Sequence, residues 1–280
     1  MKKEMNLKDI QQVSLDILKD VHDFCIANDI RYSLAYGTLI GAVRHKGFIP
    51  WDDDVDIFMP RSDYEKFCRT YSSDKYQILS SYDNDSYLAF TRVFDMTKTL
   101  VKEYVPWCRY DTGVWIDIFP LDGAEDDKDM FKSRYKRATK EWLLLYRERG
   151  ARASLSFEHT LVQNIKILVK KILYLNGIFL EKHLKQFNQL IQEYKFEDSN
   201  HWCQLTCCDN GENEYNKTSD FDELIEVDFD QYRFLIISNY DEVLRSQYGD
   251  YMQLPPEDDR HPKQMLHGGG KNCKTVFLWK

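Results

Sequence analysis

The segment 52–60, DDDVDIFMP, places four carboxylates at the start of an otherwise apolar stretch. From Asp54 onward its residues alternate between two faces, which is the period of a β-strand. An ionised carboxylate inside such a strand is costly to bury unless a cation accompanies it. The chain therefore has to build a sheet that presents the acidic start of this strand to something cationic.

The sequence around this strand predicts an α/β (α+β) fold. Amphipathic helices are expected over 6–29 and 61–71, and a short strand over 32–36 leads through Gly37 into a short helix over 38–45. Further strands are expected in four places: 76–80, 87–94, 99–105 and 113–119. This order is typical of a mixed sheet flanked by helices.

Three regions are expected along the chain: a catalytic core over 1–125, a helical insertion over 126–200, and a C-terminal region over 201–280 that packs back on the core. The insertion is basic, and its longest uncharged apolar stretch, 172–180, is nine residues. A transmembrane helix needs roughly twenty, so none is expected. Five lysines beside an apolar stripe would suit peripheral contact with an anionic membrane: Lys166, Lys170, Lys171, Lys182 and Lys185. The pattern favours an ordinary helix packed on the core.

Composition narrows the function further. The 280 residues carry a formal charge of −8, which argues against a general nucleic-acid binder, so any nucleotide handled is expected to be a small donor. Glu4 and Asp9 interrupt the apolar run that a signal peptide needs, which predicts a cytoplasmic protein.

The seven cysteines are scattered and odd in number, which favours reduced thiols. Cys203, Cys207 and Cys208, with His201 beside them, raise a zinc hypothesis. Their irregular spacing argues against it.

Asp54 and Asp56 are expected on one face of the strand, with Cβ atoms roughly 6–7 Å apart. One or two Mg²⁺ (or Mn²⁺) ions suit that gap, because these ions take carboxylates together with phosphate oxygens. Asp117, between two isoleucines in a second strand pattern, is the candidate third ligand and general base. The alternative for Asp117 is a structural role, in which it caps a loop or forms an ion pair with Arg92.

Gly37 and Thr38 lie at a strand-to-helix junction, where backbone N–H groups and the helix dipole favour an anion such as a donor phosphate. Arg44 and Lys46 add positive charge shortly before the acidic segment. Four further residues are candidates for substrate contact: Trp51, Arg92, Tyr248 and Asp250.

Three stretches together resemble one family. The segment 32–67, YSLAYGTLIGAVRHKGFIPWDDDVDIFMPRSDYEKF, is similar to the signature of the LicD family, phosphocholine transferases related to fukutin-type ribitol-phosphate transferases. GVWIDIFPLDG at 113–123 and NYDEVLRSQYGDYMQLPPEDDR at 239–260 look like the same family. The three stretches frame nearly the whole chain.

The resemblance implies a nucleotidyltransferase-like fold in which Asp54, Asp56 and Asp117 bind the catalytic metals, while Gly37 and Thr38 contact the donor phosphates. It also implies that the segment around Tyr248 and Asp250 folds back toward the site. The expected reaction is transfer of phosphocholine from CDP-choline to a cell-surface glycan, such as lipopolysaccharide or teichoic acid, or to its lipid-linked precursor.

The spacing of the acidic residues also tests other kinds of metal site. An EF-hand loop starting at Asp52 would need glycine and glutamate where Ile57 and Asp63 stand, so it is excluded. A glycosyltransferase or nucleotidyltransferase would use the same Asp54-Val55-Asp56 metal site, and stays open. A catalytically silent carbohydrate-binding relative is the third class.

Overall fold

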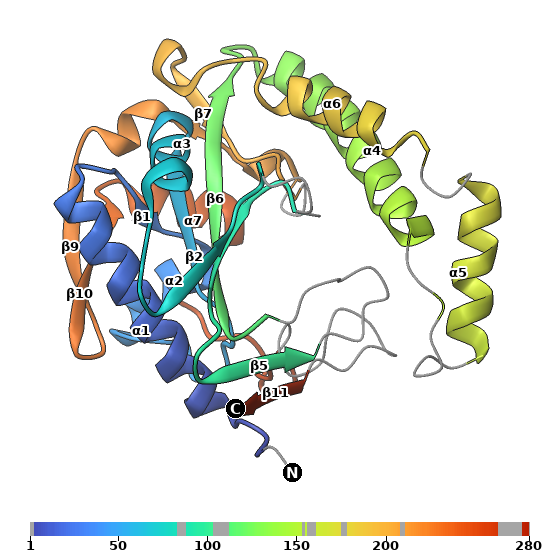
Figure 1. Ribbon diagram of the computed structural model, residues 1–280. Helices are drawn as coiled ribbons and strands as arrows, with labels where there is room; N and C mark the ends of the chain where they lie inside the picture. The colour runs from blue at the N-terminus through green and yellow to red at the C-terminus, as the bar shows by residue number, and fades with distance from the viewer. Residues whose placement is uncertain are drawn as a thin grey trace.

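The computed structural model describes residues 3–82, 88–102, 112–152, 155, 161–174, 178–207, 211–262 and 276–279. Within these residues seven strands form one curled mixed sheet (Figure 1). Five of the strands run in the order β1-β2-β6-β4-β3: Ser33–Leu34, Asp56–Pro60, Trp115–Ala124, Thr91–Asp95 and Tyr76–Leu79. The sheet continues from β6 to β7 (His201–Cys203) and from there to β8 (Tyr215–Lys217).

Strand β6 organises the sheet. It is parallel to β2 and antiparallel to β4 along its first half, and antiparallel to β7 along its second. All ten of its residues are buried. Because β6 pairs with both β2 and β4, a residue in its first half can have a partner residue in each of these two strands.

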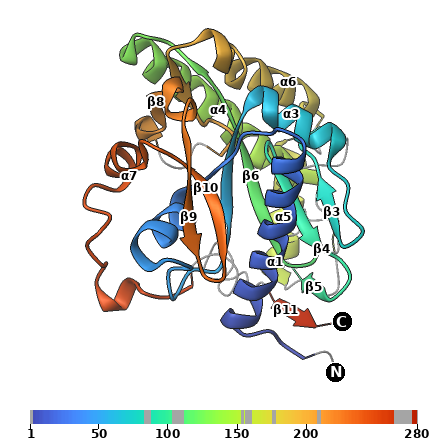
Figure 2. The same ribbon diagram turned by 90° about the vertical axis from the view of Figure 1, so that its left-hand side faces the viewer.

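Helices α1 (Leu7–Ala27) and α3 (Arg61–Thr70) pack on one side of the sheet (Figure 2). The stripe of α1 that includes Ile10, Ile17 and Val21 is buried, as its spacing predicts. Asn6 begins the helix with a capping box: its side chain accepts the N–H of Asp9 at 2.9 Å, and Asp9 accepts the N–H of Asn6 at 3.1 Å.

The remaining elements complete the core around this layer. Helix α2 (Tyr36–Ile40) runs into a π-helical turn, Gly41–His45. A hairpin of β9 (Leu224–Phe229) and β10 (Tyr232–Ile237) contacts β1, and helix α7 (Tyr240–Tyr248) follows it. Strand β5 (Thr99–Lys102) pairs with β11 (Val276–Trp279). Four short 3₁₀ turns lie between these elements: Phe196–Asp198, Gly211–Asn213, Thr218–Phe221 and Glu257–Asp259.

The region 126–200 is helical and lies on the opposite side of the sheet from α1 (Figure 1). Helices α4 (Lys128–Arg152) and α6 (Leu180–Ile191) lie side by side, and α5 (Leu161–Leu173) packs on α4. Arg134 joins α4 to the sheet: its guanidinium is fully buried, 3.0 Å from Glu125, and donates to the carbonyl of Gly123 at 2.9 Å.

Most of the expected elements are confirmed. The strand expected over 32–36 is shorter, because the chain turns into the left-handed region at Tyr36, whose φ is 48°, so α2 begins one residue before Gly37. Residue 87 and residues 103–105 of two expected strands lie outside the described residues. Among the described helices, none combines the length and the apolar character needed to cross a bilayer.

One expectation about the helical region is wrong. The apolar stripe of α5 was expected to pack on the core, but most of its large side chains face solvent. The reason is that α5 contacts α4 through its other side, around the buried Ile167.

Candidate active site

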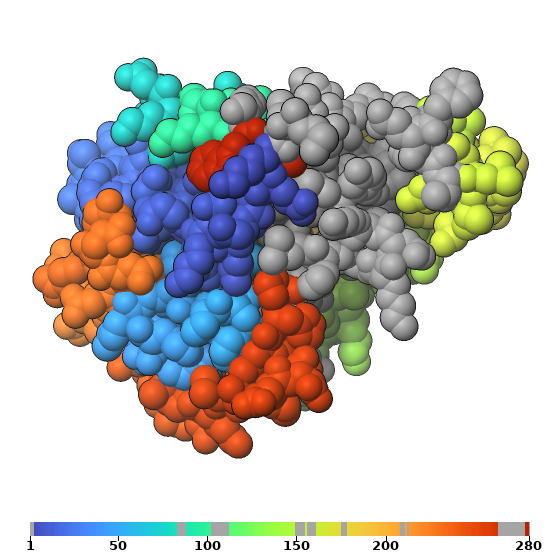
Figure 3. Space-filling view, turned by 90° about the horizontal axis from the view of Figure 1, so that it is seen from below, coloured from blue at the N-terminus to red at the C-terminus, as the bar shows by residue number. Residues whose placement is uncertain are grey.

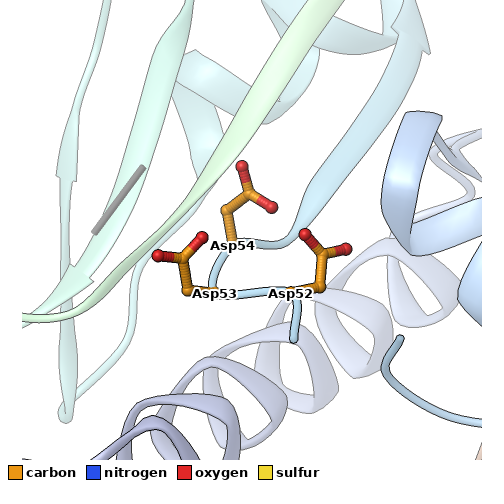
Figure 4. Close-up of side chains that lie close together, drawn as sticks. All are labelled: Asp52, Asp53 and Asp54. Carbon is orange, nitrogen blue, oxygen red and sulfur yellow. The ribbon is translucent and has the colours of Figure 1, made fainter. Parts of the chain in front are cut away.

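The acidic segment is a buried loop that leads into β2. Asp52, Asp53 and Asp54 each offer an oxygen within 4.8 Å of the others, and Figure 4 shows the three side chains rising from one turn of the chain. The side chain of Gln11, on α1, donates to the carbonyl of Asp52 at 2.8 Å and so ties this loop to the helix. The loop is therefore held in place although three like charges crowd it.

Asp56 and Asp117 are brought together by the parallel pairing of β2 and β6, whose register sets them directly opposite each other. Both are at most 8% exposed, and both line the same cavity as Asp54. Asp117, which is far from Asp54 and Asp56 in the sequence, thus faces the same space as they do.

Asp117 also forms an ion pair with Arg92, which was the alternative role predicted for it. Arg92 lies opposite Asp117 in the antiparallel pairing of β4 with β6, and its Nε is 2.7 Å from Oδ1 of Asp117. The indole N–H of Trp115 donates to the other oxygen at 3.4 Å, and the Arg92 guanidinium stacks 4.2 Å from the centre of that indole ring. Asp117 is consequently both paired and exposed to the cavity.

Burial raises the pKa of both Asp54 and Asp56 well above the usual range of a carboxyl group. For Asp54 the negative charges of Asp56, Asp52 and Asp53 add to that effect. For Asp56 those of Asp117 and Asp52 do, while Arg92 acts in the opposite direction. A cation in the cavity would relieve this repulsion, and an oxygen-only ligand set suits a hard divalent ion. The residues present therefore fit a divalent metal site.

The tightest carboxylate group differs from the predicted ligand set. Among the described residues, the acidic loop Asp52–Asp54 is the group whose oxygens come closest together, and it contains Asp54 but neither Asp56 nor Asp117. All of these aspartates line the same cavity. Carboxylate side chains can rotate when an ion binds, so residues that share the cavity can reach one ion even where their oxygens are not the closest together. Asp52 and Asp53 are thus additional candidate ligands. In the sequence, the unbroken run of three aspartates is the feature that could have identified them.

Gly37 lies against this loop. A Cβ atom at Gly37 would be 2.6 Å from Oδ2 of Asp52, which is closer than such atoms approach, so the position has room only for glycine while Asp52 keeps its place. Thr38, by contrast, is buried outside the cavity wall, and its hydroxyl accepts the backbone N–H of Asp56 at 2.9 Å. Thr38 therefore positions a carboxylate, and its contact with a donor phosphate stays a prediction.

The two basic residues predicted to bind phosphate, Arg44 and Lys46, differ in their position relative to the cavity. Arg44 lines the cavity and donates to the carbonyls of Tyr251 and Gln253, the latter at 3.3 Å, so it holds the C-terminal segment against the site. Lys46 is not part of the cavity wall. It occupies a left-handed turn with φ 59°, and its carbonyl accepts the N–H of Asp230 at 2.7 Å.

The cavity has a volume of about 710 Å³, and four parts of the chain line it: the segment from α2 to the acidic loop, the sheet, the helices α4 and α6, and the segment around the end of α7. The predicted substrate residues Trp51, Arg92, Tyr248 and Asp250 are all in its wall, which places the segment after α7 beside the acidic loop as expected. Helices α4 and α6 supply a fourth side made of Trp142, Leu145, Tyr146 and Phe187. These residues were not predicted from the sequence, because aromatic and apolar residues at helical spacing are typical of core positions.

Comparison with known proteins gives the family. A family model described as "LicD/FKTN/FKRP, nucleotidyltransferase domain" matches residues 29–149. The lipopolysaccharide cholinephosphotransferase LicD of Haemophilus influenzae is 31% identical over 277 residues, which is 93% of this chain and 96% of that protein. The chain belongs to the LicD family. Two uncharacterized proteins, from Rickettsia prowazekii and Rickettsia typhi, are 49% identical over 47 residues, 17% of this chain and 18% and 15% of theirs.

Membership of the LicD family confirms the resemblance and the fold class that the motifs predicted. The matched range, 29–149, contains Gly37, the acidic loop and Asp117. It also contains Trp142 and Tyr146, whereas Tyr248 and Asp250 lie beyond it. The cavity of this LicD family member is therefore built partly outside the family's nucleotidyltransferase domain.

The zinc hypothesis finds no support in the described part of the chain. His201, Cys203 and Cys207 do not form a group with ligand atoms close together, and Cys208 lies outside the described residues. The thiol of Cys203 is instead buried and lies 3.4 Å from the guanidinium of Arg134.

Proposed function

We propose that this LicD family member transfers phosphocholine from CDP-choline to a cell-surface glycan or its lipid-linked precursor, with Mg²⁺ or Mn²⁺ at the acidic loop. The supporting relative is named a lipopolysaccharide cholinephosphotransferase and is similar over nearly the whole chain. The observation that carries the proposal is the shared cavity of Asp54, Asp56 and Asp117, with Arg92 beside them.

Asp54 and Asp56 would hold the metal, assisted by their neighbours Asp52 and Asp53. A bound divalent ion supplies positive charge against the donor phosphates and against the CMP that leaves. Gly37 keeps the floor of the cavity free of side-chain atoms, and Arg44 lines its rim. These residues bind and orient the donor.

Asp117 is the proposed general base. The adjacent guanidinium of Arg92 favours the ionised carboxylate and fixes its orientation through the 2.7 Å contact. An acceptor hydroxyl gives its proton to Asp117 while its oxygen forms a bond to the phosphorus of phosphocholine, and the bond from that phosphorus to CMP breaks. No covalent enzyme intermediate is needed.

We place the reaction in the cytoplasm. Among the described residues, Cys25, Cys68 and Cys203 are reduced thiols, which suits a reducing compartment. Burial raises the pKa of Cys203 to about 12, so that thiol is protonated and unreactive.

The test is nucleotide release by the purified chain with Mg²⁺, offered CDP-choline, CDP-ethanolamine, CDP-ribitol and a panel of UDP-sugars, each with and without a glycan acceptor. We expect CMP from CDP-choline, and a loss of at least about a hundredfold in Asp54→Asn, because the ligand charge is removed. The released nucleotide is identified by chromatography.

The matched control is Asp23→Asn, which removes an exposed carboxylate on α1, 60% accessible, and should leave the rate unchanged. Release of nucleoside diphosphate from a UDP-sugar, with no CMP from any CDP donor, would contradict this proposal. It would support the alternative that the protein is a glycosyltransferase.

A further inference from the structure

Helix α5 presents its apolar side outward. Seven of its apolar side chains are between 48% and 76% exposed: Leu161, Val162, Ile165, Leu168, Val169, Ile172 and Leu173. Their spacing of three and four residues puts them on one broad face of the helix. Figure 3 shows α5 at one end of the molecule. Soluble monomers rarely expose so continuous an apolar surface unless it binds something.

The inner side of α5 carries its polar residues. Ile167 is buried against α4, and the ammonium of Lys170 lies 5.9 Å from the ring centre of Tyr146 on α4. The usual arrangement of a surface helix, with the apolar face inward and the polar face in water, is thus reversed. This reversal is a property of tertiary packing, since the sequence pattern alone is that of an ordinary amphipathic helix.

The charge beside the apolar face identifies its partner. The chain has a net charge of −8, yet α5 contains three lysines and no acidic residue, and one of them, Lys166, is exposed. Lys182 and Lys185, on α6, the next helix along the chain, are exposed as well. Positive charge next to an apolar helical face complements an anionic lipid surface. A symmetric dimer through α5 would instead bring the lysines of both copies together.

We propose that α5 lies in the plane of an anionic lipid bilayer, with its seven exposed apolar side chains at the boundary between headgroups and acyl chains and the exposed lysines Lys166, Lys182 and Lys185 at the lipid phosphates. A helix of 13 residues is suited to lying on a bilayer and is too short to cross it. This inference rests on α5 and not on the proposed function. If both hold, α5 lies between the bilayer and Tyr146, which contacts Lys170 and lines the cavity.

The experiment is co-sedimentation of the full chain with vesicles of equimolar phosphatidylglycerol and phosphatidylcholine, and with vesicles of phosphatidylcholine alone, in about 0.1 M NaCl. We expect binding to the anionic vesicles and at least about tenfold weaker binding by the double variant Leu168→Glu/Ile172→Glu. Lys166→Gln should lower affinity for the anionic vesicles about fivefold and leave binding to the neutral vesicles unchanged.

The matched control is Ile26→Glu/Met252→Glu, which adds the same charge at two apolar side chains, 54% and 49% exposed, on other elements. It should bind as the wild type does. Because all five substituted positions are exposed, thermal melts should show every variant folded.

Three results would overturn the inference: no binding of the wild-type chain to anionic vesicles, undiminished binding by the Leu168→Glu/Ile172→Glu variant, or a wild-type dimer that this variant converts to a monomer in sedimentation analysis. The last result would assign the face to a second copy of the chain. None of them depends on transferase activity, so failure here is distinct from failure of the proposed function.

Discussion

At the scale of single residues, the site depends on short contacts between side chains and backbone that leave little room for other residue types. Gly37 has room for no side chain beside Asp52, the hydroxyl of Thr38 fixes the start of β2, and Arg92 holds Asp117. Gly37, Thr38 and Arg92 were all candidates from the sequence. Thr38 and Arg92, however, bind groups of the protein itself, where contacts with a ligand were expected. Local patterns identify such residues, whereas their partners come from other strands.

Gly37→Ala tests this crowding. The new methyl group would meet Oδ2 of Asp52, and that carboxylate can rotate away, so we expect little change in the midpoint of thermal unfolding but a loss of at least about tenfold in transferase rate. In an Asp52→Ala background the same substitution should have almost no further effect, because the two side chains no longer meet. Equal losses in both backgrounds would show that Gly37 acts independently of Asp52.

At the scale of elements, the turn between β4 and β5 is stabilised by one buried carboxylate. Burial acts to raise the pKa of Asp95, but hydrogen bonds outweigh it and lower that pKa below its ordinary value of 3.8. The donors are the hydroxyls of Thr97 and Thr99, at 2.6 and 2.8 Å, and the backbone N–H groups of Thr97 and Lys98. A depressed pKa means that the ionised form stabilises the fold.

Asp95→Asn should therefore lower the free energy of unfolding by about 1–3 kcal/mol at pH 7, the usual range for hydrogen bonds to a charged group. The contribution of Asp95 is present above the ordinary pKa of an aspartate and is lost as the pH falls through its lower folded value. The difference between wild type and variant in urea unfolding should thus shrink below about pH 4. A difference that is constant from pH 7 to pH 3 would contradict a role for the charge.

At the scale of the whole molecule, the cavity joins four parts of the chain: the segment from α2 to the acidic loop, the strands β2, β4 and β6, the helices α4 and α6, and the segment around the end of α7. Raised pKa values of Asp54 and Asp56 mean that their ionised forms destabilise the metal-free fold. The stability of the metal-free protein should accordingly fall as the pH rises from that of an ordinary aspartate through the raised folded values.

Mg²⁺ should reverse this loss by binding the folded state. We expect the ion at saturating concentration to raise the midpoint of thermal unfolding by several degrees at pH 7.5, and by less at pH 5, where protons compete for the carboxylates. In Asp54→Asn the metal-free midpoint should rise and the response to Mg²⁺ should largely disappear. An equal response of wild type and variant would place the ion elsewhere.

The sequence by itself determined the alternation of helices and strands, the acidic segment before β2 and the carboxylate on β6, because these follow from local periodicity and from charges set among apolar residues. The tertiary structure decided what those patterns contact: Arg92 reaches Asp117 through the register of β4 with β6, and Trp142 and Tyr146 line the cavity because α4 packs across from the sheet. It also turned the apolar face of α5 outward. A periodic stripe shows that a helix has an apolar side, but only the packing of its neighbours determines what that side faces.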